Sequence, residues 1–108
     1  RIDRGCKKHR ERRQLIYMGM KQKIMIVDDA EINRQILMAI LGDKYEYVQA
    51  ENGCQAVHML QHDLTIDLIL LDINMPEMNG FQMLERMNKF HWIDEIPVIM
   101  ISSEEKRV

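Results

Sequence analysis

Side chains whose oxygen atoms could act as ligands follow directly after three short apolar segments of this 108-residue chain. These residues are Asp28, Asp29, Asp72 and Ser102. No Lys or Arg stands at the same segment ends to neutralise the acids. Carboxylates that gather in one place repel one another unless a cation lies among them. Mg²⁺ prefers oxygen ligands and commonly arrives with waters and a phosphate group. We therefore predict a Mg²⁺ site that handles a phosphoryl group, if the fold brings these residues together.

The elements that must position these residues are visible in the hydrophobic pattern. Strand-like apolar runs cover residues 24–27, 45–50, 68–71 and 97–101. Between them, apolar residues recur at helical spacing: Ile32, Ile36 and Ile40, then Ala56, Val57 and Leu60, then Phe81, Leu84 and Met87. Alternating strands and helices are typical of βαβ units around a parallel sheet, and uninterrupted apolar strands indicate burial on both faces. We predict an α/β fold, a three-layer αβα sandwich whose central strands, including residues 97–101, are buried.

Ligands of such sheets bind outside the carboxyl ends of the strands, near the point where the strand order reverses. The four residues whose oxygen atoms could act as ligands follow strands one, three and four of the predicted sheet. They are therefore expected at a single edge.

Charge is divided unevenly along the chain, although the formal net charge is only −2. Residues 1–21 carry eight Lys or Arg against two acids, whereas residues 22–108 carry seven against fifteen. We predict a basic N-terminal arm or linker over 1–21 and one acidic domain over 22–108. Either Met18 or Met20 could be the true first residue, so a start-site artefact is a further interpretation of the arm. A contact between the arm and nucleic acid is the less favoured interpretation.

Several classes of protein are excluded by composition. With 46% hydrophobic residues the chain can form a core, and no apolar segment approaches the roughly 18 residues of a membrane span. Cys6 and Cys54 lie too far apart for a C-x-x-C motif, which favours reduced thiols in a cytoplasmic protein. His58 and His62 could form half a zinc site, but they lie opposite the apolar stripe of their helix, so we interpret them as a surface pair.

Three stretches carry a family resemblance: IMIVDD at 24–29, LLDINMPEMNG at 70–80 and IPVIMIS at 96–102. They resemble the receiver domain of two-component response regulators, in order and separation, over residues 22–108. The resemblance implies a flavodoxin-like strand order and a cytoplasmic, bacterial phosphorelay switch that needs Mg²⁺. It also implies a sensor histidine kinase or histidine phosphotransfer protein as partner, with an output domain or effector protein downstream.

The resemblance assigns a role to each matching residue. Asp72 corresponds to the aspartate that accepts the phosphoryl group. Asp29 corresponds to the direct Mg²⁺ ligand and Asp28 to the acid that binds mainly through water, while the backbone carbonyl of Asn74 completes the metal set. Ser102 corresponds to the switch hydroxyl that turns toward the phosphoryl oxygens.

Further matching positions concern the loop and the lifetime of the phosphorylated form. Pro76 and Gly80 correspond to the turn that shapes the loop after the third strand. Asn74 and Glu104 occupy the positions that tune dephosphorylation, and their polar and acidic types resemble those of fast-turnover receivers.

Receivers also have a lysine at the end of a fifth strand, and no residue of this chain matches it. Lys106 follows Ser102 by only four residues, which is too close. We expect the domain to be incomplete at its C-terminus by about 30 residues, the size of a βαβ unit. A truncated or pseudo-receiver that acts as a protein-interaction module without phosphorylation is the alternative.

Overall fold

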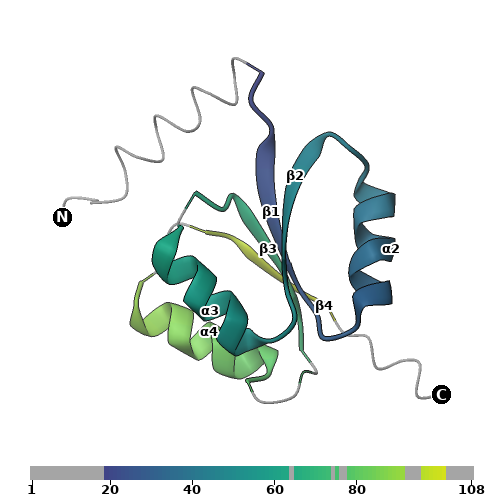
Figure 1. Cartoon of the computed structure of the whole chain (residues 1–108). Coiled ribbons are helices and arrows are strands. Elements are labelled where there is room, and N and C mark those ends of the chain that lie inside the picture. The colour runs from purple at the N-terminus through teal and green to yellow at the C-terminus, as the bar shows by residue number, and fades with distance from the viewer. Residues whose placement is uncertain (1–18, 64, 74, 76–77, 92–95, 102–108) are drawn as a thin grey trace.

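The computed structural model describes residues 19–63, 65–73, 75, 78–91 and 96–101 (Figure 1). Strands and helices alternate along the chain, as the hydrophobic pattern predicts. The elements are β1 (Gln22–Val27), α2 (Glu31–Leu41), β2 (Tyr45–Ala50), α3 (Gly53–His62), β3 (Leu68–Asp72), α4 (Gly80–Lys89) and β4 (Val98–Ile101). None of the helices in these described ranges is long and apolar enough to cross a membrane.

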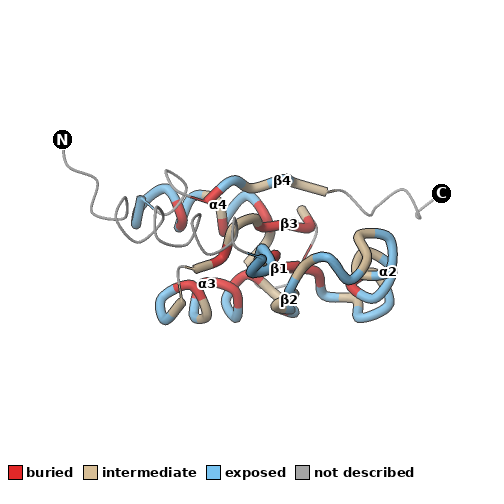
Figure 2. Tube along the Cα trace, turned by 90° about the horizontal axis from the view of Figure 1, so that it is seen from above, coloured by how far each residue is buried: buried red, intermediate tan, exposed pale blue. Residues whose placement is uncertain are grey.

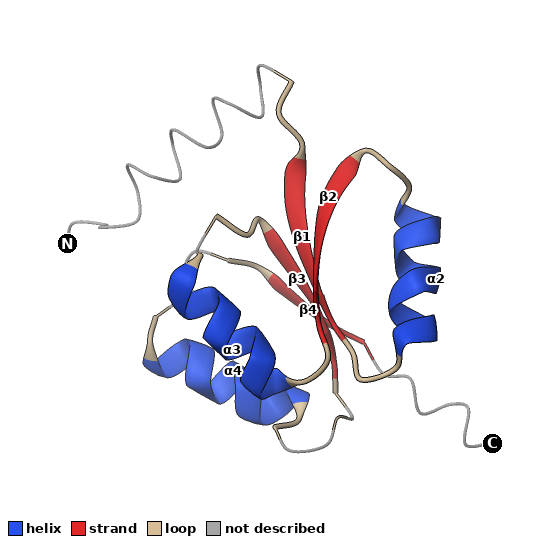
Figure 3. Ribbon diagram, viewed as in Figure 1, coloured by secondary structure: helices blue, strands red, loops and turns tan. Residues whose placement is uncertain are grey.

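The described strands form one parallel sheet with the order β2-β1-β3-β4. Helix α2 covers one face of the sheet, while α3 and α4 lie together on the other (Figure 3). The predicted three-layer αβα sandwich with a flavodoxin-like order is therefore confirmed. The chain passes from β2 across β1 to β3, so the strand order reverses between β1 and β3. This reversal is where open α/β sheets place their ligands.

The main core lies between the sheet and the pair α3 and α4 (Figure 2). Its fully buried side chains come from the sheet and from these two helices, among them Met25, Leu60, Ile69, Leu71 and Met83. A smaller cluster, built on Ile24, Ile26 and Leu70, packs under α2. Both faces of β1 and β3 are thus covered, which explains their unbroken apolar sequences.

The isoleucine stripe that indicates the first helix does not face the sheet. Ile32, Ile36 and Ile40 are 65%, 49% and 72% exposed, whereas Leu37 and Leu41 pack against the sheet. The amphipathic helix is predicted correctly, but it has two adjacent apolar rows. A spacing of three or four residues fits either row, so the sequence pattern could not tell which one is buried.

The prediction that residues 97–101 form a buried strand is wrong, and one residue on the apolar face of the third helix is also exposed. Phe81 is 61% exposed, because α4 turns Gly80, Met83 and Met87 toward the core. Strand β4 is not buried either: Ile99 is 51% exposed. This strand forms one edge of the described sheet and α2 lies near the other edge, so little of the described chain packs against one face of β4 (Figure 2).

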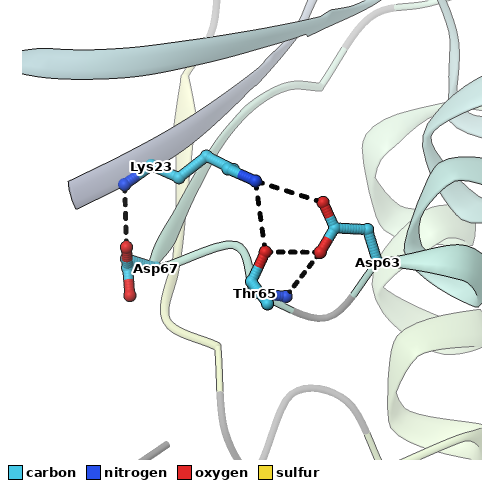
Figure 4. A network of polar contacts seen from close by, with 4 residues as sticks. All are labelled: Lys23, Asp63, Thr65 and Asp67. Carbon is cyan, nitrogen blue, oxygen red and sulfur yellow. Dashed lines mark hydrogen bonds and ion pairs between the residues drawn. The ribbon is translucent and has the colours of Figure 1, made fainter. Parts of the chain in front are cut away.

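A polar cluster ties the start of β1 to the segment between α3 and β3 (Figure 4). The Lys23 ammonium lies 3.2 Å from Asp63 Oδ2 and donates to Thr65 Oγ1 at 3.2 Å. The Lys23 amide donates to Asp67 Oδ2 at 2.7 Å. Burial alone would raise the pKa of Asp63, but hydrogen bonds from Thr65 and the Lys23 charge outweigh it and lower that pKa below its usual value. This cluster lies at the opposite edge of the sheet from the predicted site, because Lys23 is near the start of β1.

Candidate metal centre

Three carboxylates meet at the C-terminal edge of the sheet, where the strand order reverses. Oxygen atoms of Asp28, Asp29 and Asp72 all lie within 4.8 Å of one another. Val27 of β1 is the register partner of Leu71 of β3, so the residues that follow, Asp28 and Asp72, stand side by side. The predicted convergence of these acids is therefore present in the fold.

The three acids differ in their exposure to solvent. Asp28 and Asp72 are 5% and 2% exposed, whereas Asp29 is exposed. Two of the carboxylates are thus shielded from solvent, whereas the third is accessible to water.

Asp28 is held by neighbouring backbone and side-chain groups. Its carboxylate Oδ1 accepts from the Ala30 amide at 2.9 Å and from Asn33 Nδ2 at 3.5 Å. Burial raises the pKa of Asp28, the two hydrogen bonds offset part of this rise, and the charge of Asp29 adds to it. A cation among these acids would favour their charged forms, which is the reverse of what burial does.

The donor set fits a hard divalent cation. All the candidate ligand atoms are carboxylate oxygens, and oxygen-only sets suit Mg²⁺, Ca²⁺ or Mn²⁺ rather than the softer metals. Among the described residues, no other group of three His, Cys, Asp or Glu side chains is close enough to hold a metal ion. The rings of His58 and His62 do contact each other, with centroids 4.8 Å apart, and both residues are exposed, as expected of a surface pair.

The connection after Asp72 is fixed by backbone bonds and by a glycine. The Ile73 amide donates to the Ile101 carbonyl oxygen of β4, and the Gly80 amide donates to the Ile73 carbonyl oxygen, both at 3.0 Å. A Cβ on Gly80 would lie only 2.8 Å from the Asp72 carbonyl oxygen. The first residue of α4 therefore approaches the backbone of Asp72 more closely than a larger residue allows. The loop-shaping role of Gly80 stays a prediction.

The start of helix α3 also lies close to the connection between Asp72 and α4. A Cβ on Gly53 would lie 2.7 Å from the Met78 carbonyl oxygen. Asparagine side chains cap both nearby helices: Asn52 accepts from the Gln55 amide, and Asn79 forms a capping box with Gln82. The end of the connection that leads into α4 is thus held by the capping box of Asn79 and lies against the start of α3.

Four predicted site residues lie outside the described part of the chain: Asn74, Pro76, Ser102 and Glu104. Their roles as metal-binding carbonyl, loop residue, switch hydroxyl and dephosphorylation determinant stay predictions. Lys106 lies outside it too.

The sequence analysis missed a buried cation next to the acids. Arg34 of α2 is 7% exposed, and its Nη1 donates to the Asp28 carbonyl oxygen at 2.6 Å. The absence of Lys or Arg at the strand ends therefore did not exclude a guanidinium there, because this one reaches the site from a helix. The sequence held only a partial signal: Arg34 precedes Leu37, Met38 and Leu41 by three, four and seven residues, which places it in the same row. Only the structure shows that this row faces the sheet.

Comparison with known proteins identifies a family. Residues 24–108 match the family model described as the response regulator receiver domain. The chain is 34% identical over 82 residues to "Two-component response regulator ORR3" of Oryza sativa subsp. indica, covering 75% of this chain and 63% of the rice protein. The chain thus spans less than two thirds of the length of that relative.

Solved structures show the same likeness. In the "CheX-CheY-BeF3-Mg+2 complex" from Borrelia burgdorferi, the matching chain gives a TM-score of 0.73 and 31% identity, with 86% of this chain and 72% of that chain covered. The response regulator TrrA from Thermotoga maritima, in complex with Mg(2+)-BeF, gives a TM-score of 0.69 and 28% identity over 79% of this chain and 72% of that one. These relatives come from a plant and two bacteria, so the expected bacterial origin stays a prediction.

Proposed function

Because the chain belongs to the response regulator receiver domain family, we propose that it is the phosphoacceptor of a two-component phosphorelay, with Asp72 as the residue that is phosphorylated. The observation that carries this proposal is the cluster of Asp28, Asp29 and Asp72, whose oxygens lie within 4.8 Å of one another at the strand-order reversal. The proposed phosphoryl donors are a sensor histidine kinase or a histidine phosphotransfer protein. The proposed location is the cytoplasm.

The proposed reaction is a transfer between two side chains. An Asp72 carboxylate oxygen attacks the phosphorus of a phosphohistidine, and an O–P bond forms as the P–N bond breaks. The bond electrons stay with the imidazole, which takes up a proton, and Asp72 becomes an acyl phosphate. Such transfers depend on positioning and on charge stabilisation more than on covalent help from the protein.

Asp28 and Asp29 would hold a Mg²⁺ ion in this scheme, with Asp72 and the backbone carbonyl of Asn74 as the further proposed ligands. The bound ion would supply neutralising charge for the phosphoryl oxygens. Because Asp28 and Asp72 are buried whereas Asp29 is exposed, we propose that the phosphoryl group approaches Asp72 from the side of Asp29. Asn33 and the Ala30 amide keep the carboxylate of Asp28 fixed for this purpose.

The phosphoryl group would then act as a signal. It adds negative charge and oxygen acceptors next to the connection after Asp72, and we propose that Ser102 turns toward them. Asn74 and Glu104 would set how fast water removes the group. The protein turns over no separate substrate in this proposal, since its only chemistry is on itself, and an output domain or effector protein would read the new surface.

Phosphoramidate tests this proposal, because its P–N bond resembles that of phosphohistidine. The chain is incubated with phosphoramidate and Mg²⁺, and the product is treated with neutral hydroxylamine, which cleaves acyl phosphates but not phosphoserine. We expect a phosphorylated form that hydroxylamine removes. Failure of the folded protein to become phosphorylated would contradict the proposal and favour the interaction module that needs no phosphorylation.

A further inference from the structure

A buried guanidinium lies behind the metal centre without being one of its ligands. Arg34 extends from α2 toward the end of β1, and its Nη1 lies 2.6 Å from the Asp28 carbonyl oxygen. Its Nε donates to Gln49 Oε1 of β2 at 2.9 Å. One side chain therefore links α2, β2 and the backbone of an acidic site residue.

The backbone of Asp28 is constrained on both sides. Its amide donates to the Ala50 carbonyl oxygen of β2 at 3.1 Å, and its carbonyl oxygen accepts from Arg34. The carboxylate of Asp28 in turn accepts from the Ala30 amide at 2.9 Å. The peptide between Asp28 and Asp29 thus contains the carbonyl that Arg34 holds, so its orientation sets the direction in which the Asp29 side chain leaves.

The chemistry of arginine suits this task better than that of lysine. A guanidinium is planar, always charged, and presents its donors in a fixed fork. Gln49 occupies one side of this fork, and the Asp28 carbonyl oxygen lies on another. A lysine would offer the same charge from a single flexible point and could not keep both bonds in this geometry.

We propose that Arg34 is a positioning residue for the metal centre, which holds the Asp28–Asp29 peptide so that both carboxylates converge with Asp72. It also places a permanent positive charge behind three like-charged groups. This inference rests on the proposed function insofar as it takes these three acids as the Mg²⁺ ligands. Groups that orient metal ligands from behind typically change metal affinity 10–100-fold when they are removed.

The test is titration of the metal-free protein with Mg²⁺ by isothermal calorimetry. Arg34→Met keeps the apolar stem and removes donors and charge, and Arg34→Lys keeps the charge but loses the fork. We expect Arg34→Met to weaken Mg²⁺ binding by on the order of 10–100-fold and Arg34→Lys to fall between it and the wild type. Arg86→Met is the matched control, because Arg86 is exposed on α4, and it should bind Mg²⁺ as the wild type does.

A second readout needs no metal at all. Hydrogen exchange of the Ala30 amide reports whether its bond to the Asp28 carboxylate persists. We expect faster exchange at Ala30 in Arg34→Met, relative to amides of β3 in the same sample. If Arg34→Met does not fold, Arg34→Lys carries both measurements.

The possible results separate this inference from the proposed function. A wild type that binds Mg²⁺, together with a folded Arg34 variant of unchanged affinity and unchanged Ala30 exchange, overturns the positioning role alone. A wild type that binds no Mg²⁺ overturns the proposed function and this inference with it. Weaker binding in both Arg34 variants, with Arg86→Met unchanged, supports the inference.

Discussion

The backbone of Asp72 is in direct contact with the first residue of α4: a Cβ on Gly80 would lie 2.8 Å from the Asp72 carbonyl oxygen and 2.9 Å from Ile73 Cα. The helix that follows the site thus begins against the proposed phosphoacceptor itself. Any added volume at Gly80 must displace α4 or the backbone of Asp72 and Ile73. This contact links the proposed phosphoacceptor directly to a surface helix.

Gly80→Ala should therefore destabilise the protein, by about 1–3 kcal/mol, as overpacking does. Helix propensity alone predicts the opposite sign, because alanine is favoured over glycine within helices by about 1 kcal/mol. Urea unfolding measures the difference. Ala39→Gly on the exposed side of α2 is the control and should cost about 1 kcal/mol. A Gly80→Ala protein more stable than the wild type would contradict the contact.

Removing the charge of Asp28 should stabilise the metal-free protein. The pKa of Asp28 is raised by burial, so the folded state disfavours its ionised form. The stability contributed by the protonated Asp28 carboxyl is present below the ordinary pKa. It is lost as the pH rises through the raised pKa of the folded protein. At pH 7 without metal, we expect a higher melting temperature for Asp28→Asn than for the wild type.

Addition of Mg²⁺ should reverse this order, since a cation bound only by the folded state raises its stability. We expect a rise in melting temperature for the wild type and little change for Asp28→Asn. Asp43→Asn, at an exposed turn, should behave as the wild type in both buffers. Equal responses of all three proteins to Mg²⁺ would argue against a metal site at Asp28.

The cluster around Lys23 should make stability depend on pH with the opposite sign. The pKa of Asp63 is lowered in the folded protein, so its contribution is present above the ordinary value and is lost as the pH falls through the lowered one. Asp63→Asn should be less stable than the wild type at pH 7, by about 1 kcal/mol or less because the ion pair is partly exposed. The urea midpoints of the wild type and of Asp63→Asn should approach each other toward pH 3. A difference between them that widens on acidification would rule out stabilisation by the Asp63 carboxylate.

Truncation of an apolar side chain should cost much more stability in the core than on the exposed isoleucine stripe of α2. Leu60 is fully buried, so Leu60→Ala should cost about 2–5 kcal/mol. Ile40 is 72% exposed, and Ile40→Ala should cost about 0.5 kcal/mol or less in this chain. Equal losses, measured by urea unfolding, would mean that Ile40 is covered in solution.

Much of the fold could be predicted from the sequence, because each strand and helix has a clear hydrophobic period. The apolar runs at β1 and β3 indicated strands covered on both faces, and both strands are central. The convergence of Asp28 and Asp72 followed from parallel strand order, since neighbouring strand ends meet at one edge.

The remaining features depend on tertiary packing, which a hydrophobic period does not encode. The outward direction of Ile36 and the exposure of Ile99 depend on how many helices cover one face of the sheet. The contact between Arg34 and Asp28 depends on how α2 crosses β1, and the one between Gly53 and Met78 on how α3 approaches a distant connection. None of these follows from local spacing alone.

Intact-mass measurement after incubation with acetyl phosphate tests the central claim most directly. The wild type, Asp72→Asn and the control Asp43→Asn are each treated with acetyl phosphate, in Mg²⁺ or in EDTA. We predict one added phosphoryl group on the wild type and on Asp43→Asn, only in Mg²⁺, and none on Asp72→Asn. An adduct that persists in Asp72→Asn or forms equally well in EDTA would contradict the account, as would a wild type that gains no mass.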